Sequence, residues 1–467
     1  MDKKKKTDEP LDVSSLLEKY EEKPIIVKEP ASIVAAEAVP TSAEALAGKE
    51  KTADKKEKVT PEKVESRAPH AQTAGDRSFA PTQARPVEER LKEDLKMSYT
   101  AKGILDITFG GYGFLRQDYI LNPDKDIYVS TSQIRRFWLR RGDEVEGLAR
   151  PPKEGERFHS LLLIKKINGV ELTEEQSRTR KQFDQLTSMH PSKQIKLETD
   201  KEVLSTRILD VISPIGFGQR ALIVSQPKAG KTTFLKEIAE AIGKNYPDTY
   251  LMAILIGERP EEVTEIKRSL KGEVAASNFD ESPRQQVKVA NLALDRARRL
   301  AEMGKSVVVL LDSITRLARA YNMSVTGSGR SMSGGIDAQA LYPAKKFLGA
   351  ARNSEEGGSL TIIGTALVGT ESRMDDLIYE EFKGTGNMEV HLERKFADKR
   401  IYPAIDVLKS GTRHDELLVD KDTLARMATL RRMMGLLNPE EAIMALTDKM
   451  KKTKNNKEFL ASMKTAP

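Results

Sequence analysis

A short run of small and basic residues has the spacing of a phosphate-binding loop. It extends from Ser225 to Thr232 and reads Ser-Gln-Pro-Lys-Ala-Gly-Lys-Thr. Backbone N–H groups at the start of a helix can hold phosphate oxygens, the Lys231 ammonium can reach the terminal phosphates, and the Thr232 hydroxyl can bind Mg²⁺. Ser225 stands where the usual motif has glycine. The run predicts a nucleotide site, and the alternative is a Gly-Lys turn that joins a strand to a helix.

Two acidic residues follow apolar runs that have the character of strands. Residues 306–311 lead to Asp312, which is suited to orienting the water shell of Mg²⁺. Residues 251–256 lead, after one glycine, to Glu258, which we predict to polarise an attacking water. Parallel sheets hold their ligands at the C-terminal ends of their strands, where both acids would lie. Alone, each has an ordinary interpretation: an apolar strand that ends in Asp is common, and a carboxylate such as Glu258 beside a helix N-terminus is favourable without catalysis.

A third group of residues has the character of a single-stranded nucleic-acid site. Tyr112 and Phe114 are two residues apart on a predicted strand and therefore share a face, which Arg116 shares by the same period. Aromatic rings beside positive charge can stack on bases. The alternative is that both rings belong to the core of a small barrel.

Composition limits the other classes of function. The 467 residues carry a net charge of +7, which is modest for the length and hints at a polyanionic partner. Without cysteine there is no disulfide and no thiolate metal site, and the five histidines lack metal-binding spacing. The apolar runs are too short to span a bilayer. We expect a cytoplasmic protein that does not contact membranes.

Composition also divides the chain into four parts. Residues 1–94 are rich in Lys, Glu, Ala, Pro and Thr, and are predicted to be a disordered, charged tail. Residues 95–172 show short β-like runs between turns, which is typical of a small all-β barrel. Residues 173–200 are a polar connector. Residues 201–467 alternate apolar strands with amphipathic helices, which predicts a parallel α/β sheet, and end in helices.

The barrel segment resembles the primary RNA-binding domain of the bacterial Rho transcription termination factors. The resemblance is carried by the Gly-Tyr-Gly-Phe-Leu-Arg run at 111–116 and by residues 126–130, 133–137 and 150–158. It implies a cold-shock-like OB-fold that binds pyrimidine-rich, single-stranded RNA. The positions that match its base-binding residues are Tyr112, Phe114, Arg116, Tyr128, Glu156 and Phe158. A carboxylate at Glu156 could accept a hydrogen bond from the exocyclic amine of cytosine.

The rest of the chain resembles the Rho ATPase domain, through residues 216–220, 228–233, 258–263, 310–322 and 380–387. The resemblance covers roughly residues 95–467 and implies a RecA-like core, ATP and Mg²⁺ as cofactors, and a homohexameric ring that moves 5′ to 3′ along RNA and acts on the RNA polymerase elongation complex. The catalytic positions that it implies are Lys231, Glu258, Asp312 and, as an arginine finger, Arg413. The cofactor-binding positions are Gly216, Phe217, Gly218, Gln219, Arg220, Ala221, Lys228, Ala229, Gly230, Lys231, Thr232, Thr233, Arg259 and Tyr402, with Thr232 and Asp312 as the Mg²⁺ ligands.

The same resemblance assigns two loops to the central channel of the ring. Arg330 lies in the first loop and Arg373 in the second, where the family tends to have lysine. Arg400 is a further candidate for a subunit interface. Gly257 replaces an acidic residue that many Rho proteins carry beside the catalytic glutamate. That departure bears on local hydrogen bonding and on inhibitor sensitivity.

Three functions fit these residues. The first is an RNA-dependent ATPase, translocase and helicase that terminates transcription. The second is the catalytic subunit of a rotary ATPase, whose core has the same architecture and a similar Gly257-Glu258-Arg259 segment; the pair Tyr112 and Phe114 argues against it. The third is a passive RNA-binding protein with a degenerate ATP site. The five side chains that a working site needs are all present, which argues against it: Lys231, Thr232, Glu258, Asp312 and Arg413.

Overall fold

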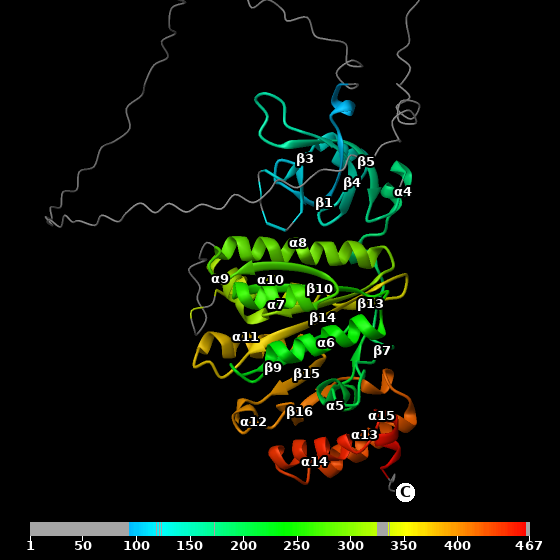
Figure 1. Ribbon diagram of the computed structural model, residues 1–467, viewed down its shortest axis with the longest axis vertical. Coiled ribbons are helices and arrows are strands. Elements are labelled where there is room, and N and C mark those ends of the chain that lie inside the picture. Colours follow the sequence, from blue (N-terminus) through cyan, green and yellow to red (C-terminus); the bar gives the residue numbers. More distant parts are fainter. Residues whose placement is uncertain are drawn as a thin grey trace, which may run out of the picture. The chain divides into compact units, whose positions relative to one another are not determined.

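The computed structural model describes residues 93–463, except 118, 121, 123, 172, 325–334 and 336. The predicted tail at 1–94 therefore lies almost wholly outside the described residues. Within them, an all-β unit is followed by an α/β unit, in the order that the sequence predicts (Figure 1). No helix in this described part is long and apolar enough to cross a membrane.

The all-β unit is a closed five-stranded barrel with the strand order β1-β2-β3-β5-β4. Alternate residues of each strand point inward, and Leu105, Leu115, Ile127 and Val145 form its buried centre. A short helix joins β3 to β4. The strands are β1 Tyr99–Ile107, β2 Gly113–Arg116, β3 Ile127–Val129, β4 Glu144–Arg150 and β5 His159–Ile167, and the helix is α3 Thr131–Arg136. A small closed Greek-key barrel of five strands is an OB-fold, as predicted.

The predicted connector at 173–200 contains several short elements that join the α/β unit. Strand β6 extends its main sheet by pairing with β13, and β7 pairs with β8. These strands have two residues each, so no periodic pattern marks them in the sequence. The elements are α4 Glu174–Thr179, η1 Phe183–Gln185, β6 Ser188–Met189, β7 Gln194–Ile195 and β8 Ile215–Gly216.

The α/β unit is built on one largely parallel sheet with the order β11-β10-β12-β14-β9-β15-β16. The antiparallel pairs in it are β15 with β16, β13 with β14, and β6 with β13. The apolar runs that predict strands, at 221–224, 250–256, 307–311 and 360–366, lie within β9, β10, β12 and β14. The bounds are β9 Arg220–Ser225, β10 Tyr250–Glu258, β11 Glu273–Asn278, β12 Ser306–Asp312, β13 Arg352–Ser354, β14 Ser359–Leu367, β15 Met388–Leu392 and β16 Ile405–Thr412.

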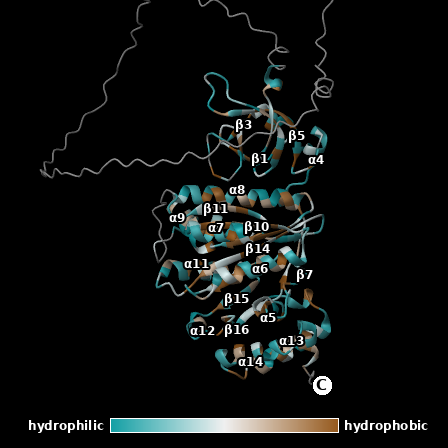
Figure 2. Cartoon of the chain, in the orientation of Figure 1, coloured by the Kyte–Doolittle hydropathy of each residue, from teal (hydrophilic) through white to brown (hydrophobic). Residues whose placement is uncertain are grey.

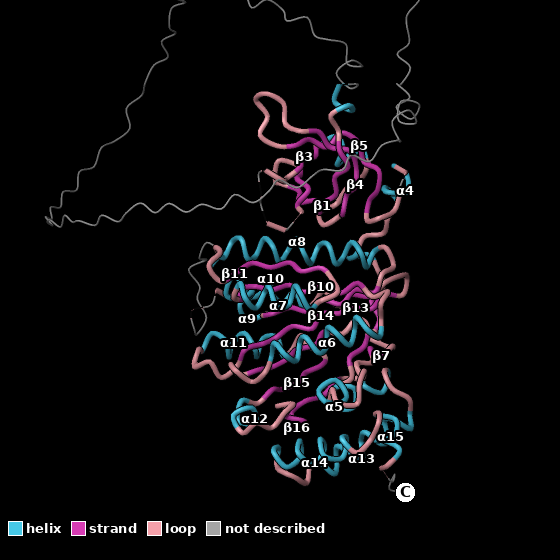
Figure 3. Tube along the Cα trace, in the orientation of Figure 1, coloured by secondary structure: helices cyan, strands magenta, loops and turns pink. Residues whose placement is uncertain are grey.

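Helices cover both faces of this sheet, because its central strands are apolar on both sides. In β10, Leu251, Ala253 and Leu255 pack into one core, whereas Met252 and Ile254 pack into the other. Figure 3 shows the strands between α8 and α6, and Figure 2 shows hydrophobic residues on the strands. The helices are α5 Leu204–Ile212, α6 Lys231–Asn245, α7 Pro260–Ser269, α8 Pro283–Glu302, α9 Ile314–Ser324, α10 Ala338–Leu348 and α11 Arg373–Lys383.

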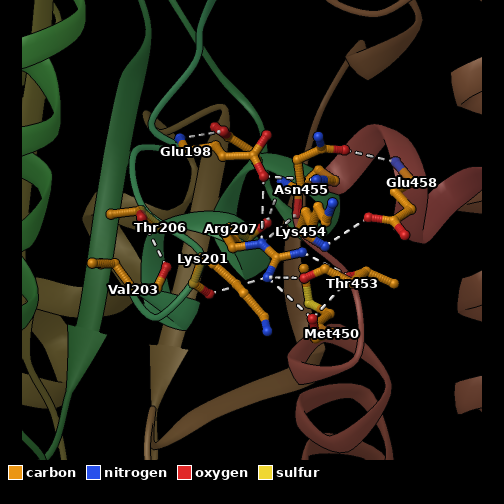
Figure 4. A network of polar contacts seen from close by, with 12 residues as sticks. Glu198, Lys201, Val203, Thr206, Arg207, Met450, Thr453, Lys454, Asn455 and Glu458 are labelled. Atoms are coloured by element: carbon orange, nitrogen blue, oxygen red, sulfur yellow. Dashed lines mark hydrogen bonds and ion pairs between the residues drawn. The ribbon is translucent and has the colours of Figure 1, made fainter.

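The chain ends in helices that pack against the edge of the α/β unit. They are α12 Arg394–Asp398, η2 Asp415–Leu417, α13 Lys421–Met434, α14 Pro439–Lys451 and α15 Asn456–Ala461. Fully buried Arg207, on α5, donates to the carbonyl oxygens of Met450 (3.1 Å) and Thr453 (3.2 Å) and lies 3.4 Å from the Glu198 carboxylate (Figure 4). These hydrogen bonds attach Arg207 to carbonyls at and just after the end of α14. One side chain therefore joins α5, the connector and the C-terminal helices.

Candidate nucleotide site and aromatic face

The predicted phosphate-binding loop joins β9 to α6. Gly230 is the N-cap residue of α6 with φ of 90°, a conformation that favours glycine. Lys228 also has a positive φ, of 65°. Ser225, in contrast, is the last residue of β9 and is fully buried, and its hydroxyl donates to the Gln226 carbonyl at 2.9 Å. The loop therefore needs glycine at its end, and serine is accommodated at its start.

Lys231, the first residue of α6, is held by two buried carboxylates. Its Nζ lies 2.6 Å from Asp312 Oδ1 and 3.3 Å from Glu258 Oε1. The parallel register of the strands explains why these three residues lie together. It aligns Leu255 with Asp312, so that β10 and β12 end on the same side of the sheet as the loop. Three residues predicted separately from sequence therefore form one cluster.

Asp312 has the environment of a cation ligand. Burial raises the pKa of its carboxyl group, while the charge of Lys231 opposes that shift. Oδ1 also accepts a hydrogen bond from the Thr365 hydroxyl at 2.7 Å, and Oδ2 makes no hydrogen bond to another described residue. A free carboxylate oxygen at the same edge as the Thr232 hydroxyl is a donor set that suits Mg²⁺, which prefers oxygen ligands and retains water.

Glu258 is positioned by the backbone before it and by a helix beside it. Gly257 has φ of 68° at an irregularity in the pairing of β10 with β11, and a side chain there would approach Arg316 at 3.2 Å. Arg316, on α9, lies 2.7 Å from Glu258 Oε1 and also donates to the Gly257 carbonyl. The glycine that departs from the family pattern thus suits a left-handed backbone.

The predicted base-binding rings form a cluster on the barrel. The centroid of Phe114 lies 4.8 Å from that of Phe158 and 5.8 Å from that of Tyr112, and Tyr112 lies 5.7 Å from Tyr128. The two rings differ in exposure: Tyr112 is 38% exposed, as stacking on a base would require, and Phe114 is 8% exposed, as a core residue would be. Tyr112 therefore offers a free ring face, whereas Phe114 mainly supports its neighbours.

Comparison with known proteins decides the family. Residues 101–173 match the Rho termination factor RNA-binding domain, and residues 205–412 match the nucleotide-binding domain of the ATP synthase alpha/beta family. The transcription termination factor Rho of Bacillus subtilis is 55% identical over 77% of this chain and 83% of its own length. The chain belongs to the Rho family.

Other relatives agree with this assignment. The Rho factor of Haemophilus influenzae is 53% identical over 78% of this chain and 87% of its own length. That of Streptomyces lividans is 52% identical over 81% of this chain, which spans about half (54%) of that longer protein. A solved ATPase of a type III secretion system shares the fold, with a TM-score of 0.51 and 23% identity over 60% of this chain and 86% of its own. The RecA-like core and the RNA-binding barrel are thus confirmed.

Arg116, which matches a base-binding position in the resemblance to the Rho family, is buried in this chain. It is 2% exposed, lies 3.2 Å from the Asp106 carboxylate, and is also paired with Asp126. Its guanidinium lies 5.0 Å from the centroid of Phe114. The residue does share the face of Phe114, as its period predicts, but the two carboxylates bury it. Its guanidinium therefore packs beside Phe114 and is not exposed to solvent.

Glu156 is oriented by a neighbouring arginine. Arg150 donates to both carboxylate oxygens, at 2.6 and 2.8 Å, and the Lys153 backbone N–H donates at 3.1 Å. The hydrogen bonds from Arg150 lower the pKa of Glu156 to about 2. The group is therefore ionised near neutral pH and can accept a hydrogen bond.

The predicted cofactor-binding residues lie on two opposite sides of the sheet, one where the parallel strands end and one where they begin. Lys228 to Thr233 lie in the loop and the start of α6, exposed Arg259 is the N-cap of α7, and exposed Tyr402 precedes β16 near the same edge. Residues 216–221, however, precede or begin β9. That strand is six residues long, so its ends lie roughly 17 Å apart at the usual rise. They do not meet the loop of the same chain.

Residues 216–221 stabilise the far edge of the sheet instead. Gly218 has φ of 91°, and a side chain there would clash with Asn353 at 2.3 Å. Gln219 donates to the Asn387 side chain at 2.8 Å. Exposed Arg413 lies at this edge too, with its N–H bonded to the Asn387 carbonyl at 2.9 Å. Because Arg413 lies away from the loop of its own chain, it can contact a nucleotide only when that nucleotide is bound in the loop of another chain.

Of the two predicted channel residues, Arg330 lies outside the described residues. Arg373 is the exposed first residue of α11. Sequence reasoning missed Arg316 and Thr365, which contact Glu258 and Asp312 directly. Arg316 lies four residues after Asp312 on the next helix, a spacing that could have indicated it; Thr365 gives no local signal, because it reaches Asp312 across neighbouring strands.

Proposed function

We propose that this Rho-family protein is an RNA-dependent ATPase that moves along nascent, pyrimidine-rich RNA as a homohexameric ring and terminates transcription by RNA polymerase in the cytoplasm. The observation that carries the proposal is one chain with both a buried Lys231–Glu258–Asp312 cluster and a partly exposed ring cluster. The core matches the nucleotide-binding domain family of ATP synthases, but the family assignment of the chain and the ring cluster favour the RNA motor.

ATP binding would rearrange the charges of the cluster. The triphosphate competes with Glu258 and Asp312 for the Lys231 ammonium, because it carries more negative charge than either carboxylate. Mg²⁺ held by Thr232 and Asp312 would neutralise the phosphates. Glu258, released from Lys231 and still oriented by Arg316 at 2.7 Å, can then accept the hydrogen bond of an attacking water.

Completion of the site requires a second copy of the chain. Arg413 lies at the sheet edge opposite the phosphate loop, so its guanidinium would reach the ATP of a neighbouring subunit. Arginine suits this position because its charge is permanent and its planar fork can bridge phosphate oxygens. Tyr402, 54% exposed, offers a ring to adenine. Arg330 and Arg373 would contact the RNA in the channel.

The barrel would capture the RNA. Tyr112 offers an exposed ring for base stacking, while Phe114, Tyr128 and Phe158 hold it in place. Ionised Glu156 can accept from the exocyclic amine of cytosine, a group that uracil lacks. We therefore expect cytidine-rich RNA to bind more tightly than uridine-rich RNA.

The test is ATP hydrolysis by the purified protein with no nucleic acid, with poly-cytidine RNA and with duplex DNA, at fixed salt. Strong stimulation by the RNA alone is the expected result. Turnover that ignores RNA would favour the rotary type of ATPase, and RNA binding without turnover would favour the passive RNA-binding protein.

A further inference from the structure

The turn between β1 and β2 carries an aromatic side chain that the proposed RNA contacts do not use. Phe109 is fully exposed, more so than any other large apolar side chain in the described part of the chain. It does not match a base-binding position of the Rho family, yet it lies within residues 101–173, which match the RNA-binding domain. An exposed ring in such a domain is a candidate contact for a base.

Hydrogen bonds fix the turn that holds Phe109. The Gly111 N–H donates to the Thr108 carbonyl at 3.0 Å. Phe109 and Gly110 lie at the centre of the β-turn that this bond closes, and Gly111 follows with φ of 79°. The Thr108 N–H (2.8 Å) and hydroxyl (2.9 Å) both donate to the Tyr112 carbonyl. This three-residue loop with a left-handed glycine is a common hairpin connection, so a defined backbone presents the Phe109 ring and little order has to be gained on binding.

The same turn places Phe109 beside the exposed ring of the cluster. A Cβ atom on Gly110 would lie 2.8 Å from Cε1 of Tyr112, so the Tyr112 ring folds back over the turn. Phe109 precedes Gly110 by one Cα–Cα step, about 3.8 Å. Tyr112 nevertheless makes its ring contacts with Phe114 and Tyr128, and Phe109 makes none with another described residue. The Phe109 ring is therefore near the cluster and still free to stack on a ligand.

A positive charge lies on the helix beside this turn. The side chain nearest to the Cβ position of Gly111 is that of Thr131, the first residue of α3, at 3.7 Å. Arg135 lies four residues later on α3 and therefore shares the face of Thr131. It is exposed and has no ion-pair partner within the described ranges, whereas Arg136 pairs with Glu174. Stacking rings beside free positive charge are the combination that holds single-stranded nucleic acid.

We propose that Phe109 is a further base-stacking position of the barrel, which holds the base next to the one on Tyr112 in a single-stranded RNA whose phosphates Arg135 can reach. The inference rests on the proposed function, because it needs RNA on the ring cluster. Every base has a face that can stack, so this position adds affinity and lengthens the site without reading the base. The preference for cytidine still depends on Glu156.

The test is binding of cytidine oligomers of increasing length to the full chain without ATP, measured by competition in fluorescence anisotropy at fixed salt. We expect Phe109→Ala to weaken binding of the longer oligomers at least about fivefold, the lower end for one stacked base, and to leave a dinucleotide unaffected. Phe109→Trp keeps a ring and should bind like the native protein, whereas Phe109→Leu keeps only apolar surface and should behave like Phe109→Ala. Trp138→Ala removes another exposed ring of the barrel unit and is the matched control, which should change nothing.

Base identity and assembly supply the other outcomes. The factor lost in Phe109→Ala should be the same for cytidine and uridine oligomers, because stacking is indifferent to the base. Native affinity of Phe109→Ala at every length, or a loss that Phe109→Leu does not share, would overturn this inference and leave the proposed function intact. So would a changed oligomeric state with unchanged RNA affinity, which would assign the ring to a contact between copies. No binding of any oligomer by the native protein would overturn the proposed function, and this inference with it.

Discussion

Lys231 contacts both acidic groups to which we assign the chemistry. It lies 2.6 Å from Asp312 and 3.3 Å from Glu258, so the three groups form an internal ion cluster. Such a cluster is satisfied without ligand, and ATP must replace its contacts with equivalent ones. Removing one member of a buried ion pair is costly, and a substitution here must keep the shape of the side chain.

Glu258→Gln keeps that shape and removes the charge. We expect ATP binding and RNA binding to persist, because the amide can still accept from Lys231 and Arg316. Hydrolysis should fall by a factor of about 10² to 10⁴, the usual contribution of a general base. The measurement is single-turnover hydrolysis at saturating ATP and RNA, with Glu261→Gln, an acid in the first turn of α7, as the control. Turnover at the native rate would refute the assignment of Glu258 as the base.

Tyr112 is the ring whose exposure makes stacking possible. Tyr112→Ala should weaken binding of a cytidine oligomer by about 1 to 3 kcal/mol, the usual contribution of one stacked base. The thermal midpoint should change little, since the ring is 38% exposed. Fluorescence anisotropy at fixed salt measures the affinity. Trp138→Ala removes another exposed ring of the barrel unit and serves as control; equal losses in both variants would argue against a specific role for Tyr112.

At the scale of elements, the strands that could be predicted from sequence are those long enough to form an apolar run. The apolar runs of β10 and β12 predicted strands because each residue is buried on one face or the other. The two-residue strands β6 and β7 lack such a pattern and were missed. Period two also placed Arg116 on the face of Phe114, but Asp106 and Asp126 come from other strands or turns, and their pairing with it depends on tertiary structure.

Helix α5 carries a buried acid whose ionisation should be visible in stability. Asp210 accepts hydrogen bonds from the backbone N–H groups of Leu197 (2.9 Å) and Glu198 (2.8 Å), yet burial raises its pKa to about 7 from 3.8. The folded protein then keeps a proton that the unfolded chain loses. This contribution to stability is complete below pH 3.8 and is lost as pH rises toward 7, at about 1.4 kcal/mol per unit of pKa difference.

Asp210→Asn should remove that dependence, because the amide does not titrate and its oxygen can still accept one N–H. The free energy of unfolding of the variant, relative to the native protein, should therefore rise between pH 4.5 and pH 7. Urea unfolding at the two pH values measures it, and Asp200→Asn, at an exposed site, is the control. A difference between variant and native protein that is equal at both pH values would contradict the raised pKa.

At the scale of the whole molecule, an RNA-binding barrel and an ATPase core lie in one chain, and neither defines the function alone. The core matches the nucleotide-binding domain of the ATP synthase alpha/beta family, whereas the barrel matches the Rho termination factor RNA-binding domain. The sequence predicted both units, because their motifs are local. It did not predict that residues 216–221 and Arg413 share the edge opposite the loop, since strand direction sets that placement.

ATP-driven movement along RNA is the central claim, and strand release tests it most directly. The substrate is an RNA–DNA hybrid with a cytidine-rich single-stranded tail on the 5′ side of the RNA, and the readout is release of the DNA strand after ATP is added. We predict release by the native protein, none by Glu258→Gln or with a non-hydrolysable ATP analogue, and little from a hybrid tailed on the 3′ side. Release without hydrolysis, equal release from both tails, or none despite RNA-stimulated turnover would contradict the account.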